Sequence, residues 1–210
     1  MVWRRREGGI ARARYPDGQM AGRKICVFCS SSDAVSPPFF DAARELGLGI
    51  GERGHGLVYG GANVGLMRAV ADAAQEGGAH VTGVIPEHIH NAGLAHHTVD
   101  ELIVTGDLRD RKRTMEQHAD AFIAMPGGFG TLEELLEIIT LRQLRLHEKP
   151  VILLNVADFW QPLLDLFEKL YQANFTKSAY RAAYSVAGTP AEALALAETD
   201  PADALPSKWY

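Results

Sequence analysis

The residues best suited to chemistry lie in a short glycine-rich stretch in the second half of the chain. Residues 125–134 read MPGGFGTLEE and stand between the apolar run 121–124 and a periodic apolar run that predicts a helix. Three glycines allow the backbone to turn tightly and to approach a ligand closely. The N–H groups at the start of the helix, beside Thr131, suit an anion. This order of strand, turn and helix predicts a phosphate-binding loop.

Two carboxylates, Glu133 and Glu134, follow this loop. Acidic residues in the first turn of a helix interact favourably with the helix dipole, so capping is one explanation for both. A carboxylate beside a bound phosphate is also placed to act on the sugar attached to that phosphate. Taken alone, this stretch leaves both roles open.

A second glycine-rich turn and a run of cations are predicted at the same edge of the sheet. The turn, GGANVGLM at 60–67, follows a short strand at 57–59 but does not have the G-x-G-x-x-G spacing of a dinucleotide fingerprint. Cations fill four of the five positions in 109–113, just after a strand at 101–104. Such a run usually means a solvated helix face, although an Arg here could also bind phosphate. Two glycine loops in one sheet favour a mononucleotide held between them.

The first predicted strand, 24–30, ends in serines and contains both cysteines of the chain. The serines at 30–32 lie where open α/β sheets bind ligands, and capping of the next helix is the alternative. Cys26 and Cys29 have the C-x-x-C spacing of zinc and redox sites, but an offset of three along a strand places them on opposite faces. We predict two buried structural thiols in a cytoplasmic protein.

Histidines gather in the segment 88–100, at His88, His90, His96 and His97. A cluster of this kind could suggest a metal, but no H-x-x-x-H helix with a third ligand accompanies it. We therefore predict no metal site and interpret the segment as an exposed loop that gates the pocket.

Strand and helix patterns alternate along the chain. This alternation predicts an α/β fold, with a single-domain, Rossmann-like, open and mainly parallel sheet that carries helices on both faces. The domain is expected to span 22–198, with flexible tails at 1–21 and 199–210. Further strands are predicted at 81–86, 120–125, 149–155 and 185–187, the last at an edge. Helices are predicted at 37–53, 132–146, 159–172 and 190–197; another opens in the turn at 60–67 and continues through 74, and the stretch 106–115 leads into one more.

Length and composition exclude several classes of protein. The 210 residues fit one α/β domain with a full core. A net charge of -5 argues against a nucleic-acid partner. No apolar run reaches the roughly 18 residues of a membrane span, and no apolar segment follows the basic N-terminus as a secretory signal requires.

Three stretches together resemble the LOG ("Lonely Guy") family, the cytokinin riboside 5'-monophosphate phosphoribohydrolases: YGG…GLM at 59–67, Arg111-Lys112, and P-G-G-x-G-T-x-x-E at 126–134. The resemblance covers roughly 23–197. It implies hydrolysis of the N-glycosidic bond of adenosine 5'-monophosphate, or of an N6-substituted form, to free base and ribose 5-phosphate. It also implies a homodimer and no metal or organic cofactor.

The resemblance assigns roles residue by residue. The catalytic pair of the family falls on Arg111 and Glu134. The phosphate loop and the residue after it fall on Gly127, Gly128, Phe129, Gly130, Thr131 and Leu132, and further pocket positions fall on Glu87, Lys112, Glu133 and Thr140. Arg109 stands where many members carry a His, a departure that could alter the pocket wall and the base preference.

The implied chemistry suits these residues. Breaking a ribosyl C–N bond builds positive charge on the sugar, which a carboxylate such as Glu134 can oppose. Arg111 would position phosphate or ribose and offset charge near the leaving base. One alternative is a non-catalytic AMP-binding sensor or carrier of the same fold. A weaker one is an amino-acid decarboxylase, a label that many family members once carried, but the sequence shows no obvious pyridoxal-phosphate site.

Overall fold

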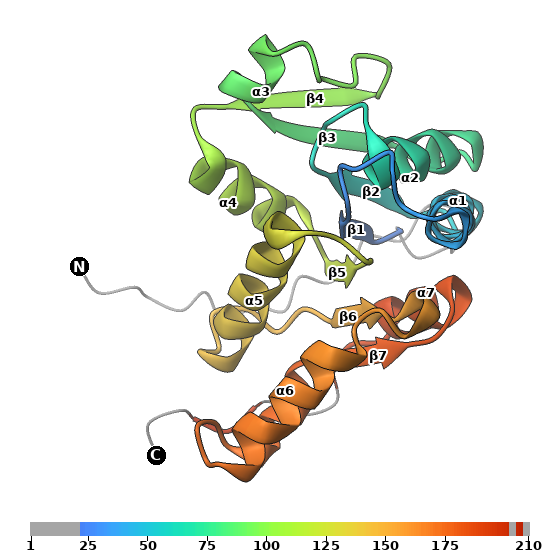
Figure 1. Cartoon of the computed structure of the whole chain (residues 1–210). Helices are drawn as coiled ribbons and strands as arrows, with labels where there is room; N and C mark the ends of the chain where they lie inside the picture. Colours follow the sequence, from blue (N-terminus) through green and yellow to red (C-terminus); the bar gives the residue numbers. More distant parts are fainter. Residues whose placement is uncertain (1–21, 202–204, 208–210) are drawn as a thin grey trace, which may run out of the picture.

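The computed structural model describes residues 22–201 and 205–207. They form one seven-stranded sheet in the order β4-β3-β2-β1-β5-β6-β7 (Figure 1). Every pairing between the described strands is parallel, which confirms the predicted open α/β sheet and the edge position of the last strand. The strands are β1 (Lys24–Phe28), β2 (Gly56–Tyr59), β3 (Val81–Pro86), β4 (Glu101–Thr105), β5 (Ala121–Ala124), β6 (Val151–Leu154) and β7 (Ser185–Ala187).

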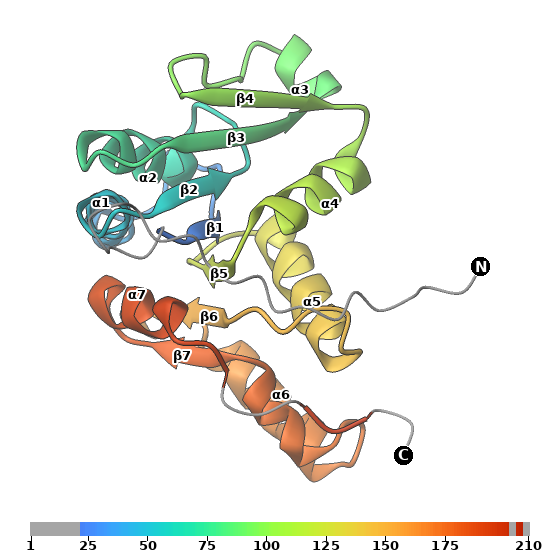
Figure 2. The same ribbon diagram turned by 180° about the vertical axis from the view of Figure 1, so that it is seen from behind.

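Helices cover both faces of the sheet (Figure 2). The side chains of α1, α2 and α7 build the core on one face, and those of α4, α5 and α6 build it on the other. The helices are α1 (Pro37–Glu52), α2 (Gly65–Glu76), α3 (Glu87–Asn91), α4 (Leu108–His118), α5 (Phe129–Gln143), α6 (Gln161–Gln172) and α7 (Pro190–Glu198), with short 3₁₀ turns at Val156–Asp158 and Ser178–Ala183.

The central strand β1 explains why its sequence is almost entirely apolar. Ile25 and Val27 pack into one helical layer, whereas Cys26 and Phe28 pack into the other. A strand covered on both faces reads as a continuous apolar run rather than an alternating one. Cys26 and Cys29 are both free and buried, and they belong to different core clusters, which confirms the prediction of opposite faces.

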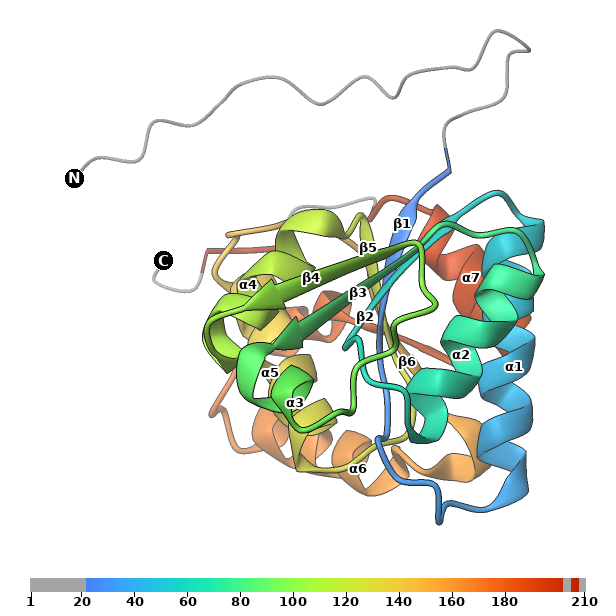
Figure 3. The same cartoon turned by 90° about the horizontal axis from the view of Figure 1, so that it is seen from above.

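The strand order reverses between β1 and β5. From β1 the chain moves outward strand by strand to β4, then returns to place β5 on the other side of β1 (Figure 3). The connections leaving the carboxyl ends of β1 and β5 therefore diverge, and open α/β sheets bind ligands in the crevice at such a point. This geometry directs attention to the loops that follow β1, β2 and β5.

Two expectations from the sequence need correction. Helix α5 begins at Phe129 rather than at residue 132, because the carbonyl of Gly128 already accepts the N–H of Leu132 at 3.0 Å. The segment 88–100 is not simply an exposed loop, since it begins in α3 and buries Ala95 and His96.

The C-terminal residues 205–207 are not a free tail. Leu205 is buried beside Phe167 and Tyr180, and the hydroxyl of Tyr180 donates to the carbonyl of Pro206. The predicted N-terminal tail, 1–21, lies outside the described residues. Within the described part of the chain, no helix combines the length and the apolar character needed to cross a bilayer.

Candidate active site

A cavity of about 480 Å³ lies at the point where the strand order reverses. It is bounded by the loops after β1, β2 and β5, by α4, and by residues from α3 and the segment that follows it. Several of its lining residues carry polar side chains: Ser30, Ser31, Ser32, Arg111, Thr131 and Glu134. Apolar side chains form the remainder of the wall, among them Ala62, Val64, Met67, Ile89, Leu94 and Met115.

The loop after β5 presents backbone to the cavity. Gly128 is the N-cap of α5, and the first-turn N–H groups of a helix have no partner within the helix. A methyl group added at Gly128 or Gly130 would meet no atom of the described residues within 4 Å, so this stretch of backbone faces open space. A methyl group at Gly127 would instead overlap the buried side chain of Thr131. The loop thus combines an open, N–H-rich face with a tightly packed base, as an anion site requires.

The loops after β1 and β2 are locked together. The N–H of Leu66 donates to the carbonyl of Ser30 at 3.0 Å, and the N–H of Gly65 donates to Oδ1 of Asp33 at 3.2 Å. Gly65 has a φ of +55°, and an added Cβ would overlap the backbone of Ser31. Of the two roles weighed for the serines, capping does not apply, because Ser36 is the N-cap of α1. The structure places the serines along the cavity.

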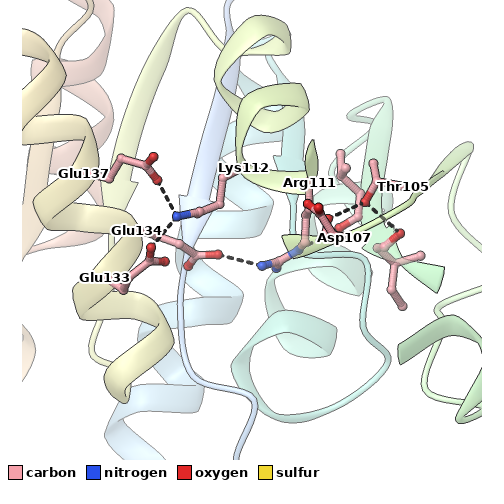
Figure 4. A network of polar contacts seen from close by, with 9 residues as sticks. Thr105, Asp107, Arg111, Lys112, Glu133, Glu134 and Glu137 are labelled. Atoms are coloured by element: carbon pink, nitrogen blue, oxygen red, sulfur yellow. Dashed lines mark hydrogen bonds and ion pairs between the residues drawn. The ribbon is translucent and has the colours of Figure 1, made fainter. Parts of the chain in front are cut away.

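Arg111 and Glu134 both line the cavity and form an ion pair with each other (Figure 4). Nη1 of Arg111 donates to Oε1 of Glu134 at 2.8 Å, and Nε donates to the carbonyl of Val84 at 3.0 Å. The guanidinium also lies against Gly60, where any side chain would overlap it. Burial raises the pKa of Glu134, and the neighbouring guanidinium partly opposes that rise. The site therefore holds a carboxylate of raised proton affinity in a fixed position.

Lys112 points to a different place from its neighbour Arg111. Its Nζ pairs with Glu133 and, at 2.8 Å, with Oε2 of Glu137, on the side of α4 that faces α5 (Figure 4). Neither Lys112 nor Glu133 is a lining residue of the cavity. Their predicted contact with the nucleotide stays a prediction.

The structure brings together six of the twelve predicted site residues: Gly128, Phe129, Gly130 and Thr131 of the loop, with Arg111 and Glu134. The others lie elsewhere. Gly127 lines a smaller neighbouring cavity with Phe39 and Phe159. Leu132 packs against the core, and the hydroxyl of Thr140 donates to the carbonyl of Leu136 beside a cavity of about 180 Å³ between α5 and α6. Glu87 is exposed at the start of α3, and Arg109, the departure from the family pattern, is exposed on α4.

The analysis of the sequence placed the segment 88–100 at the pocket but did not single out the apolar side chains of the wall. Met67 belonged to a recognised glycine turn, whereas Ile89 and Leu94 lie in a polar, histidine-rich segment. In the described part of the chain, no three His, Cys, Asp or Glu side chains converge as metal ligands. The described residues that line the cavity include no lysine, so a Schiff base to a pyridoxal group has no attachment point there.

Comparison with known proteins identifies the family of the chain. A family model described as possible lysine decarboxylase matches residues 67–197. A probable cytokinin riboside 5'-monophosphate phosphoribohydrolase of Oryza sativa subsp. japonica, LOGL2, is 45% identical over 170 residues, which cover 81% of this chain and 70% of that protein. The corresponding enzyme LOG3 of Arabidopsis thaliana is 46% identical over 159 residues, 76% of this chain and 74% of that protein.

Solved structures show the same fold. A molybdenum cofactor binding protein from the phototrophic bacterium Rippkaea orientalis matches with a TM-score of 0.64 and 27% identity, over 85% of this chain and 96% of that one. A molybdenum cofactor carrier protein from Chlamydomonas reinhardtii matches with a TM-score of 0.63 and 26% identity, over 83% and 94%. The extent of the sequence match to the phosphoribohydrolases decides the assignment, and the chain belongs to the LOG family.

Proposed function

We propose that this protein hydrolyses the N-glycosidic bond of adenosine 5'-monophosphate, or of an N6-substituted form, to free base and ribose 5-phosphate. The observation that carries the proposal is the position of Glu134. Its side chain is buried, lines the cavity one turn into α5, and is fixed by Arg111 beside the glycine loop. The relatives named for this activity support the same reaction.

The cavity suits a mononucleotide in size and in the distribution of polar groups. A volume of about 480 Å³ falls within the usual range for small-molecule sites. The phosphate would accept hydrogen bonds from N–H groups at the start of α5, near Gly128 and Gly130. The base would lie against the apolar wall that includes Leu94. The ribose would then lie between the two, next to Glu134.

The reaction needs a group that opposes positive charge on the sugar. As the C–N bond breaks, its electron pair goes to the base nitrogen and the ribose becomes oxocarbenium-like. Ionised Glu134 stabilises that charge and accepts a proton from the water that attacks C1'. An equivalent proton is taken up by the base nitrogen, so that the free base leaves and the carboxylate is regenerated. Arg111 holds the carboxylate in place and offsets negative charge that develops on the leaving base.

Chromatography of reactions with a nucleotide panel tests this function. AMP and N6-alkylated AMP should yield free base and ribose 5-phosphate, whereas adenosine, which has no phosphate, should react far more slowly. Glu148→Gln serves as a control, since Glu148 is exposed and lies outside the cavity lining. Intact AMP and N6-alkylated AMP after long incubation at high enzyme concentration would refute the proposal.

A non-catalytic nucleotide carrier is the second candidate. It is favoured by the fold shared with two proteins that bind or carry the molybdenum cofactor. A carrier would use the glycine loop but would have no need for the buried Arg111–Glu134 pair. Tight binding of AMP by the wild-type protein without hydrolysis would favour this candidate.

We also propose that the protein is a cytoplasmic homodimer. Leu136 is 40% exposed on α5 and lies beside an apolar cavity, so this helix offers a surface for a second copy. The two cysteines are free, as expected in a reducing compartment. Sedimentation equilibrium should give the mass of two chains, and a single-chain mass at micromolar concentration would exclude the dimer.

A further inference from the structure

The segment that joins α3 to β4 lies along the turn after β2. The N–H of His96 donates to the carbonyl of Gly61 at 2.9 Å, and the N–H of Asn63 donates to the carbonyl of Leu94 at 2.8 Å. These bonds accompany an antiparallel bridge between Ala62 and Ala95. Figure 3 shows the segment running beside this turn and then along α2 toward β4. The bridge therefore joins two parts of the cavity wall, because Ala62 lines the cavity and so does Leu94, the residue before Ala95.

The side chain of His96 anchors this segment from beneath. It is only 3% exposed, which is unusual for a histidine in a surface connection. Nδ1 lies 2.9 Å from the hydroxyl of Tyr59, a fully buried residue of β2, and Nε2 lies 3.2 Å from Oδ1 of Asp72 on α2. A neutral ring with its proton on Nε2 satisfies all three groups, because the Tyr59 hydroxyl then donates to Nδ1 and Nε2–H donates to Asp72.

We propose that His96 is a positioning residue that fastens the segment 92–98 to β2 and α2 and thereby fixes the Leu94 side of the cavity. Its role in substrate binding rests on the proposed function, but its role in holding the segment does not. Among the described residues, His96 forms no hydrogen bond or ion pair with Arg111 or Glu134, so losing it should weaken nucleotide binding without changing the chemical step. A loss of this kind raises KM and leaves kcat almost unchanged.

The anchor should also depend on pH. Asp72 and Arg68 of α2, Tyr59 of β2 and the adjacent His97 are the titratable groups around the ring. Burial lowers the pKa of His96, and Asp72 partly opposes that effect. Protonation of Nδ1 would leave the buried Tyr59 hydroxyl without its acceptor. The segment should therefore be held firmly near neutral pH and loosen as the solution becomes acidic.

Hydrogen exchange tests the anchor independently of catalysis. In the His96→Ala variant, the amides of residues 92–98 and of Asn63 should exchange about tenfold faster than in the wild type, while β1 keeps its protection. The exposed neighbour His97 provides the matched control, and His97→Ala should leave these rates unchanged. The His96→Asn variant, which can still accept from Tyr59, should recover part of the protection.

Steady-state kinetics then connects the anchor to the site. The KM for AMP should rise about 5- to 20-fold in His96→Ala, with kcat within about twofold of the wild type, and Leu94→Ala should behave alike.

Unchanged exchange rates in His96→Ala would overturn the proposal, and so would faster exchange with an unchanged KM. If no nucleotide is hydrolysed, the proposed function fails, and calorimetric AMP affinity replaces KM in deciding the role of His96. Should His96→Ala not fold, Tyr59→Phe removes the same hydrogen bond.

Discussion

Nη1 of Arg111 lies 2.8 Å from Oε1 of Glu134, and this ion pair joins α4 to α5 in the wall of the cavity. The two side chains are only 13% and 10% exposed. A second bond to the carbonyl of Val84 fixes the guanidinium from β3. Exposed ion pairs add little to stability, whereas a pair held this way presents a carboxylate at a defined place in a cavity.

Replacing Arg111 should shift the pH dependence of the reaction. The guanidinium lowers the pKa of Glu134 against the larger effect of burial, so Arg111→Gln should raise that pKa further. The reaction needs ionised Glu134, and activity is therefore lost as pH falls through its pKa. The acidic limb of the kcat/KM profile should move upward by about one pH unit or more. Arg109→Gln, on the exposed side of α4, should keep the wild-type profile, and an unmoved limb in Arg111→Gln would disprove the coupling.

The adjacent glycines Gly127 and Gly128 should respond differently to replacement by alanine. In Gly127→Ala the new methyl overlaps the buried Thr131, so thermal unfolding should reveal a loss of about 1–3 kcal/mol. Gly128→Ala meets open space and should change stability by less than about 0.5 kcal/mol. The second variant should nevertheless bind AMP more weakly, because its methyl lies where the phosphate would approach. Equal stability of the two variants would contradict the packing described for Thr131.

His147 should make the fold sensitive to mild acid. It is buried, Nε2 lies 2.9 Å from the carbonyl of Ile138, and Nδ1 accepts the N–H of Lys149. Burial lowers the pKa of His147 to about 4, whereas an unfolded chain protonates it near pH 6.5. The contribution of neutral His147 to the free energy of unfolding is therefore complete above pH 6.5. As pH falls toward 4, up to about 3 kcal/mol of this free energy is lost.

Denaturant unfolding at several pH values checks this effect of His147. His147→Gln retains a donor for Ile138 but does not titrate, so its stability should fall less between pH 6.5 and 4 than that of the wild type. His97→Gln, at an exposed position, should follow the wild-type curve. Parallel curves for the wild type and His147→Gln would rule out this histidine as the cause.

Glu134 should lower the stability of the fold while it serves the reaction. Because burial raises its folded pKa, ionising it disfavours the folded state. The Glu134 carboxyl stabilises the folded state most at pH values below the pKa that it has in the unfolded chain. This contribution is lost as pH rises through the higher pKa that it has in the folded protein. Glu134→Gln should therefore gain stability relative to the wild type as pH increases, which thermal melts from pH 4 to 8 would measure. If the stability of Glu134→Gln relative to the wild type instead fell as pH rises, the Arg111 cation would have a larger effect than burial on the pKa of Glu134.

The parallel sheet was predictable because its physical causes are local. Buried strands such as β1 and β6 read as continuous apolar runs, and glycine turns mark where strands give way to helices. The assignment of Arg111 and Glu134 as one pair came from matching the motifs of the family. Their contact in space depends on α4 and α5, which follow the non-adjacent strands β4 and β5. The start of α5 was placed three residues late because a glycine-rich turn does not show where helical hydrogen bonding begins.

Side-chain direction was not predictable in the same way. Thr140 matched a pocket position of the family, yet its hydroxyl bonds to the carbonyl of Leu136 at 2.7 Å. His96 looked like part of an exposed loop, because its partners Tyr59 and Asp72 lie 37 and 24 positions earlier in the chain. Contacts over such separations come from the three-dimensional arrangement of β2, α2 and the segment after α3.

Turnover of AMP by the Glu134→Gln variant at saturating substrate, measured beside its affinity for AMP, decides whether the buried carboxylate performs the chemistry. The rate of base release should fall by about 10²–10³-fold or more, because the group that opposes charge on the sugar is gone. Calorimetric affinity for AMP should stay within about threefold of the wild type, since the glycine loop is untouched. Base release at the wild-type rate by Glu134→Gln would contradict the role assigned to this carboxylate.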